Sequence, residues 1–173
     1  MTDPVWAYEP VRIAEYDPDW PRRAAELIAS LRPVLAGVIE HVGSTAVPGL
    51  AAKPVIDLMG LVDSFAEIEA IADELARLGW HYVPPELDGR EYRRFFVHVI
   101  QDRRSAHLHL MRPGTARWRQ QLAFRDLLRS SPSLRHDYAA LKERLAEANG
   151  DDREAYSAAK ASFIDTALGD RST

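Results

Sequence analysis

The 173-residue chain contains no cysteine. This absence excludes disulfide bonds, thiolate metal sites and cysteine nucleophiles, and it is compatible with a reducing compartment. No apolar run approaches the roughly 18 residues that a membrane-spanning helix needs. The opening residues, MTDPVWAYEP, lack the charged-then-apolar pattern of a secretory signal. We therefore expect a cytoplasmic protein that does not use a membrane as its partner.

Lysine is scarce, with 3 lysines against 19 arginines, and the net charge at pH 7 is −4. The charge is uneven, because the segment from Arg90 to Arg135 holds eleven arginines and three acidic residues, which give +8 and leave −12 for the remainder. Such a basic segment suggests an anionic partner, most often phosphate. The alternative is that these arginines lie on solvated helix faces and pair with the acidic remainder. The acidic overall balance argues against a long nucleic acid as partner.

Apolar periodicity and turn residues predict an α+β protein. The strand predicted at 54–62 is apolar on both faces, which is typical of a central strand, and the polar turn QDRR joins the last two strands. We expect one domain over 1–173, with a sheet core at about 1–113 and a helical segment at about 114–168. The predicted strands are 37–42, 54–62, 80–83, 93–100 and 105–111, and the predicted helices are 17–35, 64–78, 115–130, 133–148 and 152–168.

The stretch IEHVGSTAVPGLAAKPVIDLMGLV at 39–62 contains two chemically informative features. Gly43 and Ser44 follow a short apolar strand, where a glycine permits close backbone approach and free N–H groups with a hydroxyl can receive a phosphate. Asp57 lies inside an apolar strand, where an ionised carboxylate is costly unless it is paired or bound to a metal. A simple structural pairing of Asp57 with Lys53, an arginine or a histidine is the alternative.

The segment EHVGSTAVPGLAAKPVIDL closely resembles the signature of the GrpB family, a group of bacterial proteins. The resemblance continues along the chain in YDPDW, HLHL, FRDLLR, YAALK and YSAAK. That family resembles a branch of the nucleotidyltransferase superfamily, whose fold is similar to the DNA polymerase beta palm. In the superfamily, a Gly-Ser turn precedes by about ten residues a strand with an acid–apolar–acid pattern. Those acids hold divalent metal ions that bind the triphosphate and activate the attacking hydroxyl.

The resemblance implies specific roles for residues of this chain. Gly43 and Ser44 match the Gly-Ser element and Asp57 matches the first acid, so Asp57 and Ser44 are the candidate catalytic residues. The second acid position holds Met59, which cannot ligate magnesium, whereas a two-metal site needs several hard oxygen ligands. Either Glu40 or a residue of the middle strands replaces that acid, or the chain is a non-catalytic ligand-binding or regulatory domain on the same fold.

The sequence AHLHL places His107 and His109 on one face of a strand, about 6.5–7 Å apart along the chain. Two imidazoles favour zinc, iron, nickel or copper over magnesium. If this strand lies beside the Asp57 strand, the three residues form a two-histidine, one-carboxylate metal site, and His98 on the preceding strand can join or orient it. Ordinary histidines on a half-exposed strand are the alternative.

Two of the three lysines belong to Tyr–Lys pairs spaced i, i+4, which are Tyr138 with Lys142 and Tyr156 with Lys160. They are candidates for contacts with phosphate, and helix-surface pairs with nearby acids are the alternative. Lys53 lies between the glycine turn and Asp57, and arginines precede a strand at the expected edge of the cleft. The candidate phosphate-binding residues are Gly43, Ser44, Lys53, Arg90, Arg93, Arg94, Lys142 and Lys160.

Together these features predict a nucleotidyltransferase-like mixed sheet flanked by helices, with a helical C-terminal segment. We expect it to bind a nucleotide or another phosphorylated small molecule in a metal-assisted cleft. The candidate metal ligands are Asp57, His107 and His109, and the cofactor is magnesium, or zinc or nickel if the histidines ligate. Two other functions stay open at this point: a non-catalytic binding domain, and a single-metal enzyme built on these three ligands.

Overall fold

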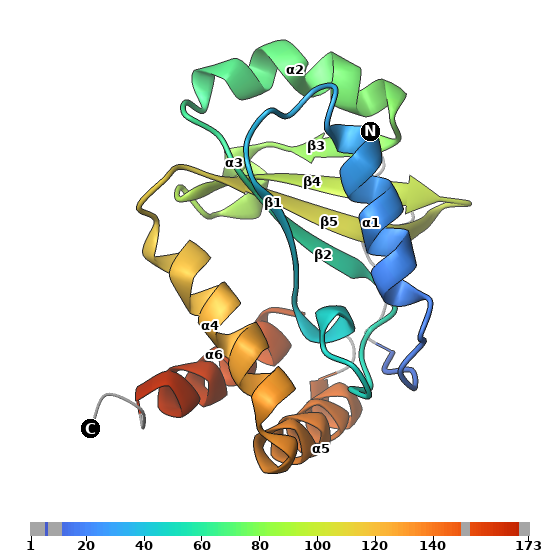
Figure 1. The fold of residues 1–173 in the computed structure, drawn as a ribbon, viewed down its shortest axis with the longest axis vertical. Helices are drawn as coiled ribbons and strands as arrows, with labels where there is room; N and C mark the ends of the chain where they lie inside the picture. Colours follow the sequence, from blue (N-terminus) through green and yellow to red (C-terminus); the bar gives the residue numbers. More distant parts are fainter. Residues whose placement is uncertain (1–5, 7–11, 150–152, 170–173) are drawn as a thin grey trace.

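Five strands form one mixed sheet in the computed structural model, which describes Trp6, residues 12–149 and residues 153–169 (Figure 1). The strand order is β1-β2-β5-β4-β3. The pair β2–β5 is parallel, and the other neighbouring pairs are antiparallel. The strands are β1 Ile39–Val42, β2 Ile56–Leu61, β3 Trp80–Val83, β4 Arg93–Ile100 and β5 Arg103–Met111.

One face of the sheet is covered by α1 (Trp20–Leu31) and α2 (Ala66–Arg77). Leu58 on β2 and Leu108 on β5 are register partners on this face, and both are fully buried against the two helices. This layer is the main hydrophobic core. Its other buried members are Trp20, Ala24, Leu31, Leu35, Ile39, Ala52, Ile56, Ile68, Leu75, Trp80, Phe96, Ala106 and Leu110.

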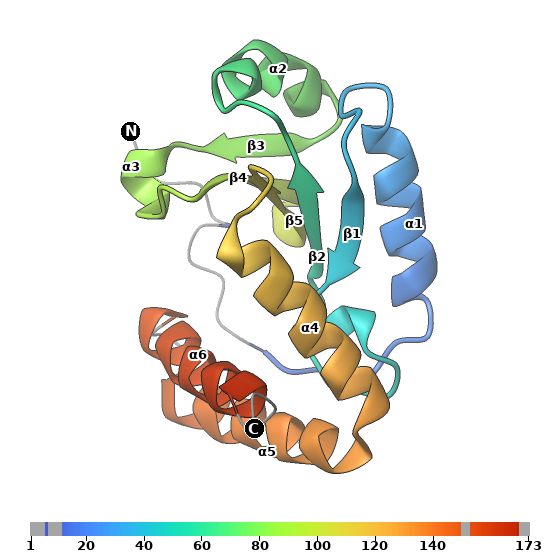
Figure 2. The same ribbon diagram turned by 60° about the vertical axis from the view of Figure 1, so that its left-hand side comes forward.

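The opposite face of the sheet meets the helical C-terminal segment. Its helices are α4 (Ala116–Ser130), α5 (Pro132–Asn149) and α6 (Arg153–Gly169). Figure 2 shows α4 running from the sheet to the α5–α6 pair. Where α4 meets the sheet, Trp118 and Leu122 pack on buried apolar residues of β1, β2 and β5. None of the described helices combines the length and the apolar character that crossing a membrane requires.

The predicted α+β architecture is confirmed, and the differences from the expected elements are local. The turn between β4 and β5 contains only Gln101 and Asp102, two residues fewer than the predicted QDRR turn. Their φ angles are 50° and 58°. Positive φ at both central residues suits the right-handed twist of a two-residue hairpin, so β5 begins at Arg103 and not at Ser105. The short helices η2 (Ser44–Ala46) and α3 (Pro85–Asp88) were not predicted, because three or four residues show no helical periodicity.

Candidate functional site

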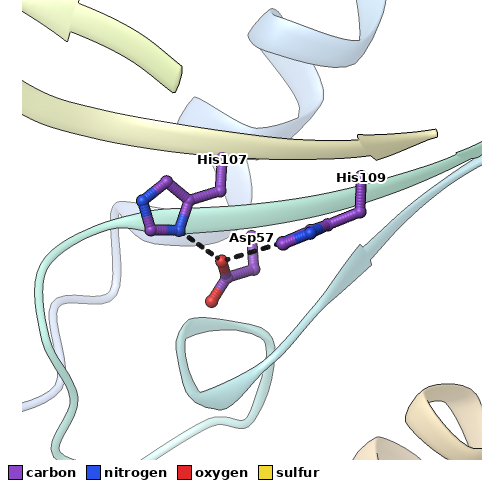
Figure 3. A group of neighbouring side chains, drawn as sticks. All are labelled: Asp57, His107 and His109. Atoms are coloured by element: carbon purple, nitrogen blue, oxygen red, sulfur yellow. Dashed lines mark hydrogen bonds and ion pairs between the residues drawn. The ribbon is translucent and has the colours of Figure 1, made fainter. Parts of the chain in front are cut away.

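A carboxylate and two imidazoles converge on the sheet face opposite the main core (Figure 3). The parallel pairing of β2 with β5 sets Asp57 beside His107 and Met59 beside His109, so alternation directs both histidines to the Asp57 face. His107 Nδ1 lies 3.0 Å from Asp57 Oδ1, and His109 Nε2 lies 3.6 Å from the same oxygen. The Asp57 side chain is 33% exposed and each histidine side chain is 16% exposed, so the group is accessible from solvent.

The second carboxylate oxygen of Asp57 faces the glycine turn. A β-carbon at Gly43 would lie 2.7 Å from Asp57 Oδ2, a distance at which atoms collide. Gly43 also has a φ of 71° and a ψ of −171°, a region that essentially only glycine adopts. The Gly-Ser turn and the strand carboxylate are therefore in direct contact, and glycine is required at residue 43 for two separate reasons.

His41 and Thr45 stabilise this turn from its other side. His41 Nε2 and Thr45 Oγ1 are 2.9 Å apart, which joins the end of β1 to η2 by a hydrogen bond. The Arg125 guanidinium on α4 donates to the carbonyl oxygen of His41 at 3.0 Å, and the Arg129 guanidinium donates to the Ala46 carbonyl at 2.9 Å. These contacts anchor α4 to the turn, so these two arginines of the basic segment have structural partners.

The charges at the centre are fixed by burial and by hydrogen bonds. Burial raises the pKa of the Asp57 carboxyl, but the hydrogen bond with His107 and the interaction with His109 outweigh it, and the net pKa lies below its usual value. Burial lowers the pKa of His109 to about 4 and lowers that of His107 as well, although Asp57 opposes both shifts. At neutral pH the centre therefore holds one anionic carboxylate and two neutral imidazoles, the protonation states that metal ligands need.

The donor set fits a single metal ion with nitrogen and oxygen ligands. One potential ligand atom from each of Asp57, His107 and His109 lies within 4.8 Å of the others. Among the described side chains, His107 Nε2 is a buried nitrogen without a hydrogen-bond partner, and it is not the nitrogen that faces Asp57, which is Nδ1. One carboxylate with two imidazoles suits zinc, nickel or iron better than magnesium.

A two-magnesium site does not fit this face. Met59, at the second acid position, is 1% exposed and packs with Val42, Met111 and Trp118. Glu40 lies opposite Met59 in the β1–β2 register, but its Oε2 accepts a hydrogen bond from Arg125 at 2.9 Å. The acid–apolar–acid pattern therefore has only its first acid here, and the nearest replacement is held by a guanidinium.

Two of the three predicted phosphate-binding lysines, Lys160 and Lys53, interact electrostatically with the Asp57 centre. Lys142 on α5 is 2% exposed, and its ammonium donates to the Ala51 carbonyl in the loop before β2. Lys160 on α6 is partly buried over the Tyr156 ring and interacts electrostatically with Asp57. Two further interactions connect the same region: Ser44 hydrogen-bonds with Tyr138, and Lys53 acts electrostatically on His107.

The three predicted arginines lie in different environments. Arg93 reaches His109 from β4 and also binds Asp88, whereas Arg90 is 44% exposed and pairs with Asp88 alone among the contacts described for it. Arg94 projects from the opposite face of the sheet, where its guanidinium lies 4.2 Å from the centroid of the Phe65 ring. The structure therefore does not bring Arg94 together with Asp57, because neighbouring residues on a strand point to opposite faces.

His98 does not join the histidine pair. It pairs with Ala106 in the β4–β5 register and so lies on the core face of the sheet, away from His107. Its Nδ1 lies 2.5 Å from Ser105 Oγ, and its ring packs against Trp80. The expectation that His98 orients the metal site is wrong, because the alternation along β4 directs it to the other side.

The space between the turn and the C-terminal helices is narrow. A cavity of about 30 Å³ lies beside Gly43 and Ser44, with Phe124, Tyr138 and Ile164 among its lining residues. This volume holds one or two water molecules and no phosphate group. A wider hollow of about 420 Å³ lies at Asp63 and Arg112–Thr115 and includes none of the predicted site residues. The cavity beside the Gly43–Ser44 turn is therefore too small for a phosphate group in this conformation.

Solved structures define the class to which this fold belongs. The chain is similar to the Cid1 poly(U) polymerase bound to Mg 3′-dATP, with a TM-score of 0.57 and 13% identity over 85% of this chain and 49% of that chain. At this identity the similarity concerns the fold alone, which is nucleotidyltransferase-like. The crystal structure of the conserved protein GrpB from Enterococcus faecalis matches with a TM-score of 0.81 and 30% identity, over 94% of this chain and 100% of that chain.

Sequence comparison identifies the family. The model of the family described as GrpB protein matches residues 10–170, and the chain belongs to this family. A UPF0157 protein of Halalkalibacterium halodurans is 36% identical over 157 residues, which are 89% of this chain and 78% of that protein. A protein of Mycolicibacterium paratuberculosis named dephospho-CoA kinase is 29% identical, and the match covers 89% of this chain but only 44% of that protein.

Proposed function

We propose that this protein binds a nucleotide or another phosphorylated small molecule at the Asp57 centre, with one divalent transition metal held by Asp57, His107 and His109. The observation that carries the proposal is the convergence of one carboxylate and two neutral imidazoles beside the Gly43–Ser44 turn. The nucleotidyltransferase-like fold supports a phosphorylated ligand at this position of the sheet.

A bound ion would neutralise charge on phosphate oxygens, which is the chemistry that a Lewis-acidic metal supplies. The chain itself supplies the anchoring charge through Asp57, and Gly43 leaves room for close approach of a ligand to the backbone. Ser44 offers a hydroxyl at the start of η2. Because Met59 removes the second acid, the site supports binding at a single metal better than two-metal nucleotidyl transfer.

The lysines supply the positive charge that a phosphate needs. Lys142 is buried with its ammonium on a backbone carbonyl, and Lys160 lies on the neighbouring helix close enough to repel it. Two like charges in a partly buried place are unfavourable without an anion, and a bound phosphate would relieve this repulsion. Lys53 approaches the same centre from the loop before β2, and Arg93 reaches it from β4. Arg90 remains a candidate phosphate-binding residue at the edge of the site.

A non-catalytic binding or regulatory domain is the second candidate function. The buried Met59 and the Glu40–Arg125 pair favour it, because both remove ligands that two-metal catalysis would use. The two candidates share a ligand site and differ in turnover. An assay for release of pyrophosphate from each bound nucleoside triphosphate separates them.

The test combines metal analysis with thermal shift on the purified full chain. Metal content is measured first, and unfolding temperatures are then recorded with zinc, nickel or magnesium, each with and without ATP, CTP, inorganic pyrophosphate or dephospho-CoA. Dephospho-CoA is included because a relative carries the name of a kinase for it. Zinc or nickel at one equivalent, with stabilisation by a phosphorylated ligand, is the expected result.

Substitutions at Asp57, His107 and His109 test whether these residues cause the metal binding and the thermal shift. His107→Ala/His109→Ala should abolish transition-metal binding, and Asp57→Asn should abolish both metal and ligand effects. The double variant His81→Ala/His136→Ala changes two exposed histidines on other elements and is the matched control. A magnesium-dependent ATP shift that survives loss of His107 and His109 but not of Asp57 would instead favour a magnesium nucleotidyltransferase. No stabilisation by any metal or ligand would reject the proposed function.

A further inference from the structure

Arg93 is fixed in place by an acidic partner and by the ring of Phe95. Its Nε and one terminal nitrogen donate to the two carboxylate oxygens of Asp88 at 2.8 and 2.5 Å. The Asp88 side chain is 4% exposed and the Arg93 side chain is 10% exposed, so the pair is shielded from solvent. The guanidinium lies 4.3 Å from the centroid of the Phe95 ring, and Phe95 stacks on His109. A buried two-point pair with this geometry holds Arg93 in one orientation.

The remaining terminal nitrogen of Arg93 contacts Nδ1 of His109. A guanidinium only donates hydrogen bonds, so Nδ1 is the acceptor. A neutral imidazole carries one hydrogen, which must then lie on Nε2. Nε2 is the atom that faces Asp57 Oδ1, and its N–H is directed to the carboxylate. In this arrangement the lone pair of His109 is occupied by Arg93, and the face toward Asp57 presents a hydrogen.

This arrangement opposes metal ligation by His109. A metal ion between Asp57 and His109 needs the Nε2 lone pair, so the hydrogen must move to Nδ1, where it would meet the N–H of Arg93. The ring nitrogen opposite a metal normally donates to a carboxylate, a carbonyl or water. At His109 that nitrogen faces a cation with donors only.

We propose that Arg93 and the metal ion compete for His109, so that Arg93, held by Asp88, is the positioning residue that controls whether the centre can bind a metal. The inference rests on the proposed function, because it concerns the same three ligands. Metal binding requires Arg93 to leave His109, and the released guanidinium then lies beside the centre on the strand that borders it, where it can donate hydrogen bonds to a phosphate oxygen. The segment α3, which contributes Asp88, is thereby coupled to the centre.

The first arm of the test requires no metal. Long-range ¹H–¹⁵N NMR spectra of the metal-free protein show which ring nitrogen of His109 carries the hydrogen. We expect hydrogen on Nε2 in the wild type and a larger Nδ1 population in Arg93→Met, where Asp57 alone still favours the Nε2 hydrogen. Arg90→Met is the matched control, because Arg90 also contacts Asp88 but has no described contact with His109, and it should keep the wild-type tautomer. A wild-type hydrogen on Nδ1 would overturn the proposal.

The second arm measures the affinity for zinc by competition with a chromophoric chelator. Arg93→Met should bind zinc at least about tenfold more tightly than the wild type, the scale on which groups behind a metal ligand change affinity. Asp88→Asn should shift affinity in the same direction by a smaller factor, and it serves as the second variant if Arg93→Met does not fold. Arg90→Met should bind as the wild type does.

The outcomes separate this inference from the proposed function. Zinc affinity in Arg93→Met that is equal to or weaker than that of the wild type would reject the competition between Arg93 and the metal ion. Either result would still be compatible with a metal site at Asp57, His107 and His109. If neither protein binds zinc, nickel or cobalt, the metal centre and the competition are both rejected. Tighter binding in Arg93→Met together with the Nε2 hydrogen in the wild type supports the proposal.

Discussion

Gly43 lies against the carboxylate of Asp57, so that a β-carbon at residue 43 would come within 2.7 Å of Oδ2. The contact joins the turn after β1 to the start of β2, where the β1–β2 register already pairs Val42 with Asp57. One oxygen of the carboxylate faces the two histidines and the other faces the turn. Asp57 therefore lies between the candidate metal ligands and the candidate phosphate seat, and it belongs to both.

Replacing Gly43 by alanine should destabilise the fold and remove ligand binding. The positive φ costs about 1–3 kcal/mol for a residue with a β-carbon, and the collision with Asp57 adds roughly 1–3 kcal/mol as an overpacked contact does. Urea unfolding of Gly43→Ala measures the sum. Gly49→Ala is the control, because Gly49 has a φ of 76° and no atom within 4 Å of the added carbon. Equal losses in the two variants would show that the contact with Asp57 has no energetic effect.

Replacing Met59 by aspartate should not restore a two-metal site. The side chain is 1% exposed among apolar residues, so a carboxylate there would be buried without a partner. We expect a loss of about 3 kcal/mol or more in the free energy of unfolding, whereas Met59→Leu, which conserves volume, should lose less than about 1.5 kcal/mol. A Met59→Asp protein that is as stable as the wild type and gains magnesium-dependent ATP binding would revive the two-metal interpretation.

Lys142 should link stability to pH in the alkaline range. Burial, assisted by the charge of Lys160, lowers the pKa of Lys142 to about 7 from 10.5. Between these values the unfolded chain binds more protons than the folded chain, so stability should rise with pH by up to about 1.4 kcal/mol per pH unit. Lys142→Met should flatten this dependence in urea unfolding from pH 7 to 10.

The same substitution separates stability from binding. Lys142→Met should leave the free energy of unfolding at pH 7 unchanged or raise it, because a buried ammonium is removed, and it should weaken inorganic pyrophosphate binding by roughly tenfold, as loss of one charge-assisted contact does. Arg144→Met removes an exposed cation from the same helix and should alter neither property. A large loss of stability in Lys142→Met would assign the ammonium a structural role at the Ala51 carbonyl.

His41 should make the fold sensitive to mild acid. Burial lowers the pKa of His41 to about 4, against the attraction of Asp57. Since its pKa is lower in the folded chain than in the unfolded one, its contribution is complete above about pH 6.5 and is lost as the pH falls toward 4. Unfolding free energies measured from pH 7 to 4.5 should fall less steeply in His41→Gln than in the wild type. His136→Gln, which changes an exposed histidine on α5, is the control, and equal slopes in His41→Gln and the wild type would contradict the prediction.

Local patterns allowed most of the fold to be predicted. The apolar periods of the strands and helices extend over several residues each, so β3 and β4 have the predicted ends and the three C-terminal helices lie within about one residue of theirs. The short elements η2 and α3 escaped prediction, and α3 carries Asp88, which holds Arg93. Sequence reasoning placed Arg93 among phosphate ligands. No local signal indicated its contact with His109, because the two residues lie 16 positions apart in the sequence, on different strands.

The sequence by itself determined the family signature, the elements of the fold and the anomaly of Asp57 in an apolar strand, because each depends on residues close together in the chain. Only the tertiary structure decided which side chains meet. The parallel pairing of β2 with β5 brings Asp57 to histidines 50 and 52 positions later, and strand alternation sends His98 and Arg94 to the opposite face. The packing of α4 buries Met59, and the Asp88–Arg93 pair sets the hydrogen of His109. Strand partners and ring hydrogen bonds are non-local, so no pattern along the chain could specify them.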